Sequence, residues 1–184
     1  IAVGSVVTEK TLSATDCSAS FEGLPYGQYQ VKETGSGVGY LLDTTVHDVT
    51  IPSNNSTSLS VEFKNQVIRG DVKFKKVDQN GQAMANIPFR ITSKTTGESH
   101  IVVTDTNGVV NTSSSINLHS NHTNGYDSIS NFDTATYQSY GTWFGKSASN
   151  SSAASVNDSL GALPYDTYEI VEVSCKQNQF CYDI

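Results

Sequence analysis

The chain has 184 residues, with 11 basic against 18 acidic residues and a formal net charge of -7. This acidic balance argues against a nucleic-acid partner and against binding to an anionic membrane surface. No apolar run approaches the roughly 20 residues that a membrane-spanning helix needs, so we expect no membrane insertion in this segment. Ser, Thr, Asn, Gly, Val and Tyr are abundant and apolar residues lack helical spacing, which favours an all-β fold.

One phrase occurs twice in the chain, as LPYGQYQVKE at 24–33 and as LPYDTYEIVE at 163–172. In each copy the proline favours a turn and the following residues alternate as in a β-strand, so side chains two apart share a face. Glu33 and Glu172 therefore share a face with aromatic and aliphatic side chains. A carboxylate on an apolar face needs a partner, and the repetition predicts two related domains.

The first half ends on a predicted strand at 59–67 that alternates strictly between apolar and polar residues. One face of this strand carries Leu59, Val61, Phe63 and Asn65. Asn65 is thus directed towards the same kind of core as Glu33. His47 stands alone on an earlier predicted strand, where we interpret it as a surface or structural residue.

The link between the halves contains Arg-Gly-Asp at 69–71, so we place the domains at 1–68 and 69–184. Integrins can bind this tripeptide on an exposed loop, but three residues recur easily by chance. The strand predicted next directs Val72, Phe74 and Lys76 to one face and Lys73 and Lys75 to the other. Parity therefore selects Lys76 as the inward lysine.

Strands are predicted at 87–92 and 101–104. At 111–159 the strand alternation ends, and the sequence is rich in Ser, Asn and Thr with scattered aromatics. We interpret this stretch as an insertion. Aromatic rings beside Asp and Asn suit a glycan-binding surface, with Trp143 as the platform and Tyr137 and Tyr140 nearby. A loop folded over its own aromatic cluster is the other interpretation.

Cysteine and histidine give few signals of a bound metal or cofactor. His119 and His122 could supply two metal ligands, but no further histidine or cysteine joins them nearby, so we predict neither a metal nor a cofactor. Cys175 and Cys181 could close a short disulfide in an oxidising compartment, or remain two free thiols, and Cys17 would be unpaired.

Several short motifs of the second half stand in a familiar order: KVD at 76–78, MANIPF at 84–89, TDTNG at 104–108 and the phrase at 163–172. Together they resemble the collagen-adhesin B-type (CnaB) domain, also called the SpaA-like or prealbumin-like domain. The resemblance implies two tandem β-sandwich domains of the prealbumin-like, reverse Ig-like fold. Such modules build the stalks and pili of Gram-positive surface proteins, so it also implies an extracellular, cell-wall-anchored location and neighbouring B-type domains as partners.

The same resemblance implies a chemistry. In that family a lysine on the first strand, an asparagine or aspartate on the last and a glutamate between them form a spontaneous intramolecular isopeptide bond. Burial favours a neutral lysine amine, which can act as the nucleophile, and a protonated glutamate, which can polarise the amide and transfer protons. The reaction occurs once per domain, so it is maturation and not enzymatic turnover.

Transfer of these roles to the present residues leaves each domain incomplete. The first half offers Glu33 and Asn65 but no first-strand lysine, because the setting of Lys10 lacks the strand pattern. The second half offers Lys76 and Glu172 but no last-strand amide. We therefore expect a segment of a longer protein, the first domain lacking its N-terminal part and the second its last strand, with the missing strands supplied by the same chain or by a neighbour.

The function predicted from these features is a non-enzymatic stalk or pilin-like module of a cell-surface adhesin, stiffened by Lys-Asn isopeptide bonds. The alternative is an adhesin domain that binds a host glycan or matrix protein through the insertion at 111–159. An enzyme is the weakest interpretation, because the sequence has no nucleophile elbow, zinc motif or phosphate-binding loop.

Overall fold

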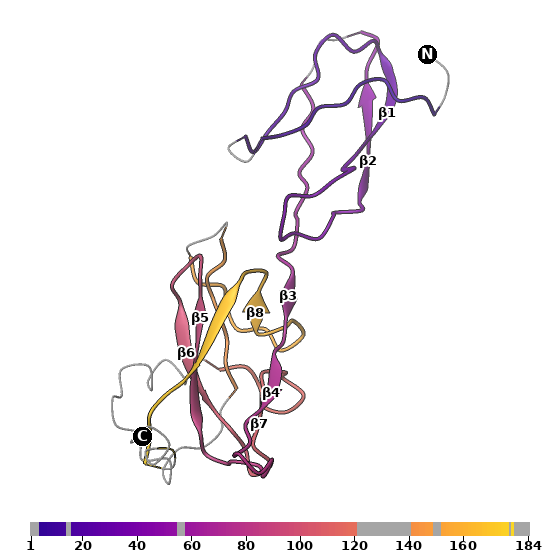
Figure 1. The fold of residues 1–184 in the computed structure, drawn as a ribbon. Helices are drawn as coiled ribbons and strands as arrows, with labels where there is room; N and C mark the ends of the chain where they lie inside the picture. The colour runs from indigo at the N-terminus through magenta and orange to yellow at the C-terminus, as the bar shows by residue number, and fades with distance from the viewer. Residues whose placement is uncertain are drawn as a thin grey trace. The chain divides into compact units, whose positions relative to one another are not determined.

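The computed structural model describes residues 4–13, 16–54, 58–120, 141–148, 152–176 and 178. Within these ranges the chain forms antiparallel β-strands and no helix, which confirms the all-β prediction (Figure 1). None of the described segments therefore provides a helix that could cross a membrane. The chain divides into two compact units, Ile1–Gln66 and Val67–Ile184. The division falls just before the Arg-Gly-Asp segment.

The first unit is built on a two-stranded antiparallel sheet of β1 (Gly27–Lys32) and β2 (Val46–Ile51), in which Tyr29 faces Val49 and Val31 faces His47. The segment at 61–67 alternates in burial as predicted, but it contributes no strand to a named sheet, and Leu59 is 51% exposed. His47 packs edge-on against Phe63 at 4.8 Å between ring centroids, which supports its interpretation as a structural residue.

The second unit contains three sheets, all antiparallel (Figure 1). The largest has the order β6-β5-β9, and the two smaller sheets pair β3 with β8 and β4 with β7. The strands are β3 (Arg69–Gly70), β4 (Lys73–Lys75), β5 (Pro88–Ser93), β6 (Ser99–Val103), β7 (Val109–Asn111), β8 (Leu163–Pro164) and β9 (Tyr168–Glu172). The beginning of the unit is thus paired with segments on both sides of the insertion.

Every deeply buried side chain among the described residues lies in the second unit. Its main core consists of Ile91, Val102, Val110, Phe144, Ala162 and Leu163. A smaller cluster joins Ile87, Ile101 and Cys175. Full burial of one large aliphatic or aromatic side chain contributes about 1.5–3 kcal/mol, so the second unit holds most of the hydrophobic stabilisation in the described structure.

Both copies of the repeated phrase form the same turn, in which a tyrosine hydroxyl bonds to a proline carbonyl oxygen four residues earlier. The hydroxyl of Tyr29 donates to the carbonyl oxygen of Pro25 at 2.7 Å, and that of Tyr168 donates to Pro164 at 2.8 Å. The tyrosine thereby fixes the turn that the proline begins, and the strand that follows carries the glutamate in a defined direction. The sequence repeat is therefore also a repeat of structure.

Candidate cross-linking site

Lys76 follows β4 directly, and its backbone is held from two directions. Its N–H donates to Gly108 O at 2.8 Å, and its carbonyl accepts from Met84 N at 3.1 Å. A Cβ at Gly108 would stand 2.5 Å from Lys76 O, so this close approach requires glycine. The Lys76 side chain is 25% exposed, while Lys73 and Lys75 are exposed, as strand parity predicts.

Glu172 ends β9 and stands opposite Phe89 of β5. Its Oε2 atom lies 2.7 Å from Nζ of Lys76. Its Oε1 atom accepts a hydrogen bond of 2.9 Å from Nδ2 of Asn178. The glutamate side chain is 18% exposed. One carboxylate therefore contacts an amine with one oxygen and a side-chain amide with the other.

Asn178 is fully buried, and all its polar side-chain atoms have partners. Nδ2 also donates to Val173 O at 2.9 Å, while Oδ1 accepts from Cys175 N at 2.6 Å. These contacts define which end of the amide is which, because the nitrogen faces two acceptors and the oxygen faces an N–H donor. The second unit thus brings a lysine, a glutamate and an asparagine together.

Asn178 was not singled out from the sequence, because it lies in the turn directly after β9 and not on a later strand. In the first unit the equivalent amide, Asn65, is separated from Glu33 by β2 and the segment that follows it. The signal that could have identified Asn178 is local: an asparagine three residues after Cys175 can close a turn onto the backbone, as asparagine side chains commonly do.

The first unit contains two of the three groups. Asn65 Nδ2 donates to Glu33 Oε1 at 2.7 Å, and Asp43 N donates to Glu33 Oε2 at 2.8 Å. Oδ1 of Asn65 is buried and accepts no hydrogen bond from the described residues. Lys10 donates to Ser20 O and lies over the ring of Phe21 at 5.8 Å, so its amine is engaged elsewhere.

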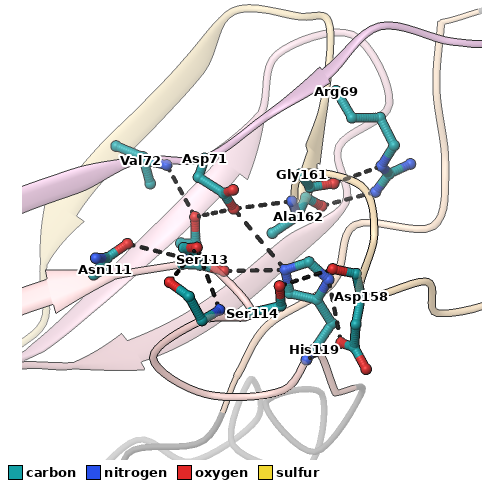
Figure 2. Close-up of polar contacts among 12 residues, drawn as sticks. Arg69, Asp71, Val72, Asn111, Ser113, Ser114, His119, Asp158, Gly161 and Ala162 are labelled. Carbon is teal, nitrogen blue, oxygen red and sulfur yellow. Dashed lines mark hydrogen bonds and ion pairs between the residues drawn. The ribbon is translucent and has the colours of Figure 1, made fainter.

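Of the Arg-Gly-Asp segment, Arg69 is partly buried, whereas Gly70 and Asp71 are exposed. Arg69 donates to the carbonyl oxygens of Gly161 at 2.7 Å and Ala162 at 2.8 Å (Figure 2). It also donates to the carbonyl oxygen of Phe144 at 2.5 Å. Its guanidinium lies 3.6 Å from the centroid of the Trp143 ring. Burial lowers the pKa of Arg69 from its usual value, although nearby acidic groups oppose that shift. An arginine held in this way is not available to a receptor as part of an exposed tripeptide.

Trp143 is only 1% exposed, and its Nε1 donates to Ala154 O at 2.9 Å. Its ring is packed inside the second unit, so the structure does not present it as a surface platform for a glycan, and that part of the prediction is corrected. Tyr137 and Tyr140 lie outside the described residues. Packing against Arg69 explains why the only tryptophan of the chain is buried and not exposed.

The other predicted site residues are placed only in part. Cys175 is buried and unbonded among the described residues, whereas Cys181 lies outside them, so the choice between a disulfide and two thiols stays a prediction. His122 is outside the described ranges as well. Where the structure describes the chain, no group of three His, Cys, Asp or Glu residues could hold a metal ion.

Comparison with known proteins gives a family for the first unit. Residues 2–67 match the family model described as SpaA, a prealbumin-like fold domain. The chain is also similar to the TIE protein of Bacillus anthracis, with 32% identity and a TM-score of 0.40, over 48% of this chain and 17% of that one. Comparison with the curated proteins found no match.

The first unit is thus an all-β module. Residues 2–67 are similar to the SpaA, prealbumin-like fold domain, which is the family that the resemblance predicted. The relation of the second unit to the first rests on the repeated phrase, the shared Tyr-Pro hydrogen bond and the shared Glu-Asn contact.

Proposed function

We propose that the chain is a stalk or pilin-like module of a Gram-positive surface protein, and that its second unit joins Lys76 to Asn178 by an isopeptide bond. The SpaA-like domain at 2–67 supports the stalk or pilin class. The single observation that carries the cross-link is that the carboxylate of Glu172 contacts both Lys76 and Asn178. The proposed reaction occurs once in each molecule, so it is a maturation step and not enzymatic turnover.

The contacts suit an exchange of one amide for another. Glu172 takes a proton from Nζ of Lys76, and the neutral amine attacks Cγ of Asn178. Negative charge then develops on Oδ1, where the N–H of Cys175 is already aimed at 2.6 Å. Glu172 passes that proton to Nδ2, the bond from Cγ to Nδ2 breaks and ammonia leaves, and the attacking nitrogen gives its second proton to the freed carboxylate of Glu172, so that a neutral amide forms.

The bond would connect the beginning of the second unit with the turn that follows β9. By the chain-entropy reasoning applied to disulfides, closure of a loop of about 100 residues stabilises the folded state by about 4.7 kcal/mol through restriction of the unfolded chain. Because of this restriction of the unfolded chain, we expect the cross-linked form to unfold at a clearly higher temperature. The reaction also removes the charge of Lys76, so Glu172 would then contact neutral amide groups.

Intact mass tests the proposal directly. The chain should be lighter than its sequence mass by about 17 Da, the mass of one ammonia released on aminolysis of an amide. Lys76→Met and Asn178→Ala should each show the full sequence mass of the variant. Lys75→Met is the matched control, because that lysine is exposed on the opposite strand face and should leave the loss intact. Peptide mapping should recover Lys76 and Asn178 in one branched peptide.

The same masses show whether the cross-link forms and which side-chain amide reacts. A full sequence mass for the unmodified chain would contradict the cross-link. A loss of ammonia that survives Asn178→Ala would assign the reaction to another amide and would remove Asn178 from the site. Glu172→Gln should form the bond far more slowly, because a glutamine cannot carry the proton from the amine to the leaving group.

The first unit is expected to remain unreacted by itself. Its Glu33-Asn65 pair leaves Oδ1 of Asn65 without a partner among the described residues, and Lys10 is bound elsewhere. We propose that a lysine from a neighbouring segment or B-type domain completes it. Peptides that contain Asn65 should therefore keep their full mass in the isolated chain.

Adhesion to a host ligand is the second function that the sequence suggests, and it now depends on residues other than Trp143. A glycan array tests it: selective binding that is lost in the Tyr137→Ala, Tyr140→Ala double variant would support an adhesin role for the insertion. No binding across a broad panel, or binding unchanged in the double variant, would leave the stalk or pilin role.

A further inference from the structure

Two turns of the second unit contain the same short pattern, Asp-x-Asn-Gly, outside the proposed cross-linking contacts. One lies at 78–81 and the other at 105–108. In an Asn-Gly pair the backbone nitrogen of the glycine can attack Cγ of the asparagine, because glycine has no Cβ to hinder the approach. A third pair, Asn124-Gly125, lies outside the described residues. The two described turns are therefore candidate sites of self-modification.

The two turns have the same internal hydrogen bonds. In each, a carboxylate oxygen of the aspartate accepts from the N–H of the asparagine and from that of the residue after the glycine, all at 2.8 Å. The glycine N–H donates to the carbonyl oxygen of the aspartate, at 3.1 Å for Gly81 and 2.9 Å for Gly108. Both glycines have a positive φ, of +79° and +71° respectively. Because the local conformations match, a difference in reactivity between the pairs must come from what surrounds each turn.

Gly108 fixes the turn at 105–108 to the backbone around Lys76. It is buried, and its carbonyl oxygen accepts from Lys76 N at 2.8 Å. A Cβ at Gly108 would stand 2.5 Å from Lys76 O and 3.0 Å from Met84 N. β7 begins at Val109, directly after the turn, and pairs with β4. The nitrogen of Gly108 therefore reaches the side chain of Asn107 only if the contacts around Lys76 are broken first.

The turn at 78–81 has much less around it. Asn80, Gly81 and Gln82 are all exposed. A Cβ at Gly81 would meet no heavy atom within 4 Å in the described part of the chain. The turn joins two short segments that are bridged at Val77 and Ala83. Opening of this turn breaks only its own hydrogen bonds, so the nitrogen of Gly81 reaches the side chain of Asn80 at little cost.

The reaction needs no reagent other than water. The glycine nitrogen loses its proton to water and bonds to Cγ of the asparagine, while Nδ2 takes up a proton from water and leaves as ammonia. The product is a cyclic imide. Water then opens the ring at one of its two carbonyl groups. Opening at one carbonyl gives aspartate, and opening at the other gives isoaspartate, which adds one methylene group to the main chain. Either product carries a new negative charge.

We propose that Asn80-Gly81 is a site of spontaneous modification at which Asn80 converts to aspartate and isoaspartate, and that the fold protects the identical pair Asn107-Gly108. The protected pair is the one whose glycine holds the backbone of Lys76. An isoaspartate at 107 would lengthen the main chain at that contact, whereas one at 80 alters only an exposed turn. Modification can thus accumulate at Asn80 while Lys76 keeps its position. The proposal does not depend on the cross-link.

Peptide mapping of the full chain during incubation in warm, mildly alkaline buffer tests the proposal and follows each Asn-Gly pair separately. Peptides with a converted asparagine are about 1 Da heavier, because an amide has been replaced by a carboxyl group. In the folded chain Asn80 should convert roughly tenfold or more faster than Asn107, since Asn107 must await local opening around a buried glycine. In urea, where that packing is lost, the two rates should become similar. Equal rates in the folded chain, or the same difference in urea, would overturn the proposal.

Variants and amide exchange provide independent checks. Asn80→Gln should abolish the early conversion, because the longer side chain would have to close a larger ring, and Asn107→Gln is the matched control that should leave it unchanged. Early conversion that persists in Asn80→Gln would overturn the assignment. The amide of Gly81 should exchange hydrogen roughly tenfold or more faster than that of Gly108, although both follow an asparagine. Equal protection of the two amides would contradict the proposed difference in opening.

The cyclic imide and the proposed cross-link each lack one ammonia, about 17 Da, so intact mass alone does not separate them. Brief alkaline treatment does, because it opens the imide and leaves an amide between two side chains intact. A mass deficit that disappears on this treatment and maps to Asn80 belongs to the modification. A deficit that persists belongs to the cross-link. The absence of either one therefore overturns only the proposal to which it belongs.

Discussion

The hydroxyl of Tyr168 donates a 2.8 Å hydrogen bond to the carbonyl oxygen of Pro164, four residues earlier, and so fixes the turn that leads into β9. Tyr168→Phe removes this bond from a partly buried site and should lower the free energy of unfolding by about 1 kcal/mol. Urea denaturation at neutral pH measures the difference. An unchanged midpoint in Tyr168→Phe would show that the bond does not stabilise the turn.

Alkaline pH should act through the same tyrosine. Burial raises the pKa of Tyr168, and nearby Asp166 adds to the shift. Its contribution to stability is therefore complete below about pH 10, where tyrosine ordinarily titrates, and is lost as the pH rises further. Thermal denaturation at increasing pH should show a steeper loss for the unmodified chain than for Tyr168→Phe. Parallel losses in the two proteins would assign the alkaline transition to other groups.

Glu98 should make the second unit sensitive to acid. Burial alone would raise the pKa of this carboxyl, but hydrogen bonds from His100, Gly145 and Lys146 outweigh it and lower the pKa on balance. The stabilisation is present above the ordinary range of a glutamate and disappears as the pH falls. Glu98→Gln should cost about 1–3 kcal/mol at pH 7 and reduce the acid sensitivity.

The control for this prediction is Glu169→Gln, because Glu169 pairs with Lys94 at a site where both side chains are 51% exposed. Such surface pairs contribute about 0–1 kcal/mol. Urea denaturation at pH 7 and at about pH 4 should therefore separate the two variants. Equal losses from both substitutions would contradict the assignment of acid sensitivity to Glu98.

Two glycines in contact should respond differently to alanine. A Cβ at Gly161 would stand 2.5 Å from backbone atoms of Gly70, whereas a Cβ at Gly70 would meet nothing within 4 Å. Gly161→Ala must push the backbone at position 161 away from β3, and it should lower the free energy of unfolding by about 1–3 kcal/mol or more. Gly70→Ala should be nearly neutral. Thermal denaturation of the pair distinguishes steric conflict from a general effect of glycine replacement.

Arg69 should not be replaceable by lysine. A guanidinium can donate to three carbonyl oxygens while stacking on Trp143, and a single ammonium cannot reproduce that planar fork. Arg69→Lys should lower the free energy of unfolding by about 1.5–3 kcal/mol, the size of one charged hydrogen bond. Arg90→Lys is the control, since Arg90 lies partly buried on β5 with a 3.2 Å bond to Ser99 Oγ. Equal effects would mean that the three carbonyl contacts carry little energy.

The sequence predicted the features that depend on strand alternation. The parity of 72–78 placed Lys76 inward, and that of the repeated phrase placed Glu172 on the same side, where the two meet at 2.7 Å. Alternation has a period of two residues, so a short stretch of sequence is enough to assign a face. The same reasoning brought Asn65 to Glu33, at 2.7 Å.

The contacts that depend on tertiary structure could not be obtained in this way. Trp143 looked like a surface aromatic because it lies in a stretch rich in Ser, Asn and Thr, yet Arg69, from the start of the unit, covers its ring. Asn178 has no strand pattern around it and gains its role from a turn. His119 looked like half of a metal pair, and only the fold brings Thr112 and Asn157 to its two nitrogens.

The position of Lys76 has a mechanical consequence. Its backbone is held by Gly108 and Met84, and its side chain reaches the carboxylate that also holds Asn178. Tension that enters the second unit from the first passes along Arg69 and β4 before it reaches Lys76. A bond from there to Asn178 would carry that tension directly to the far side of β9. The sheet β6-β5-β9 and the insertion would then bear little of this tension.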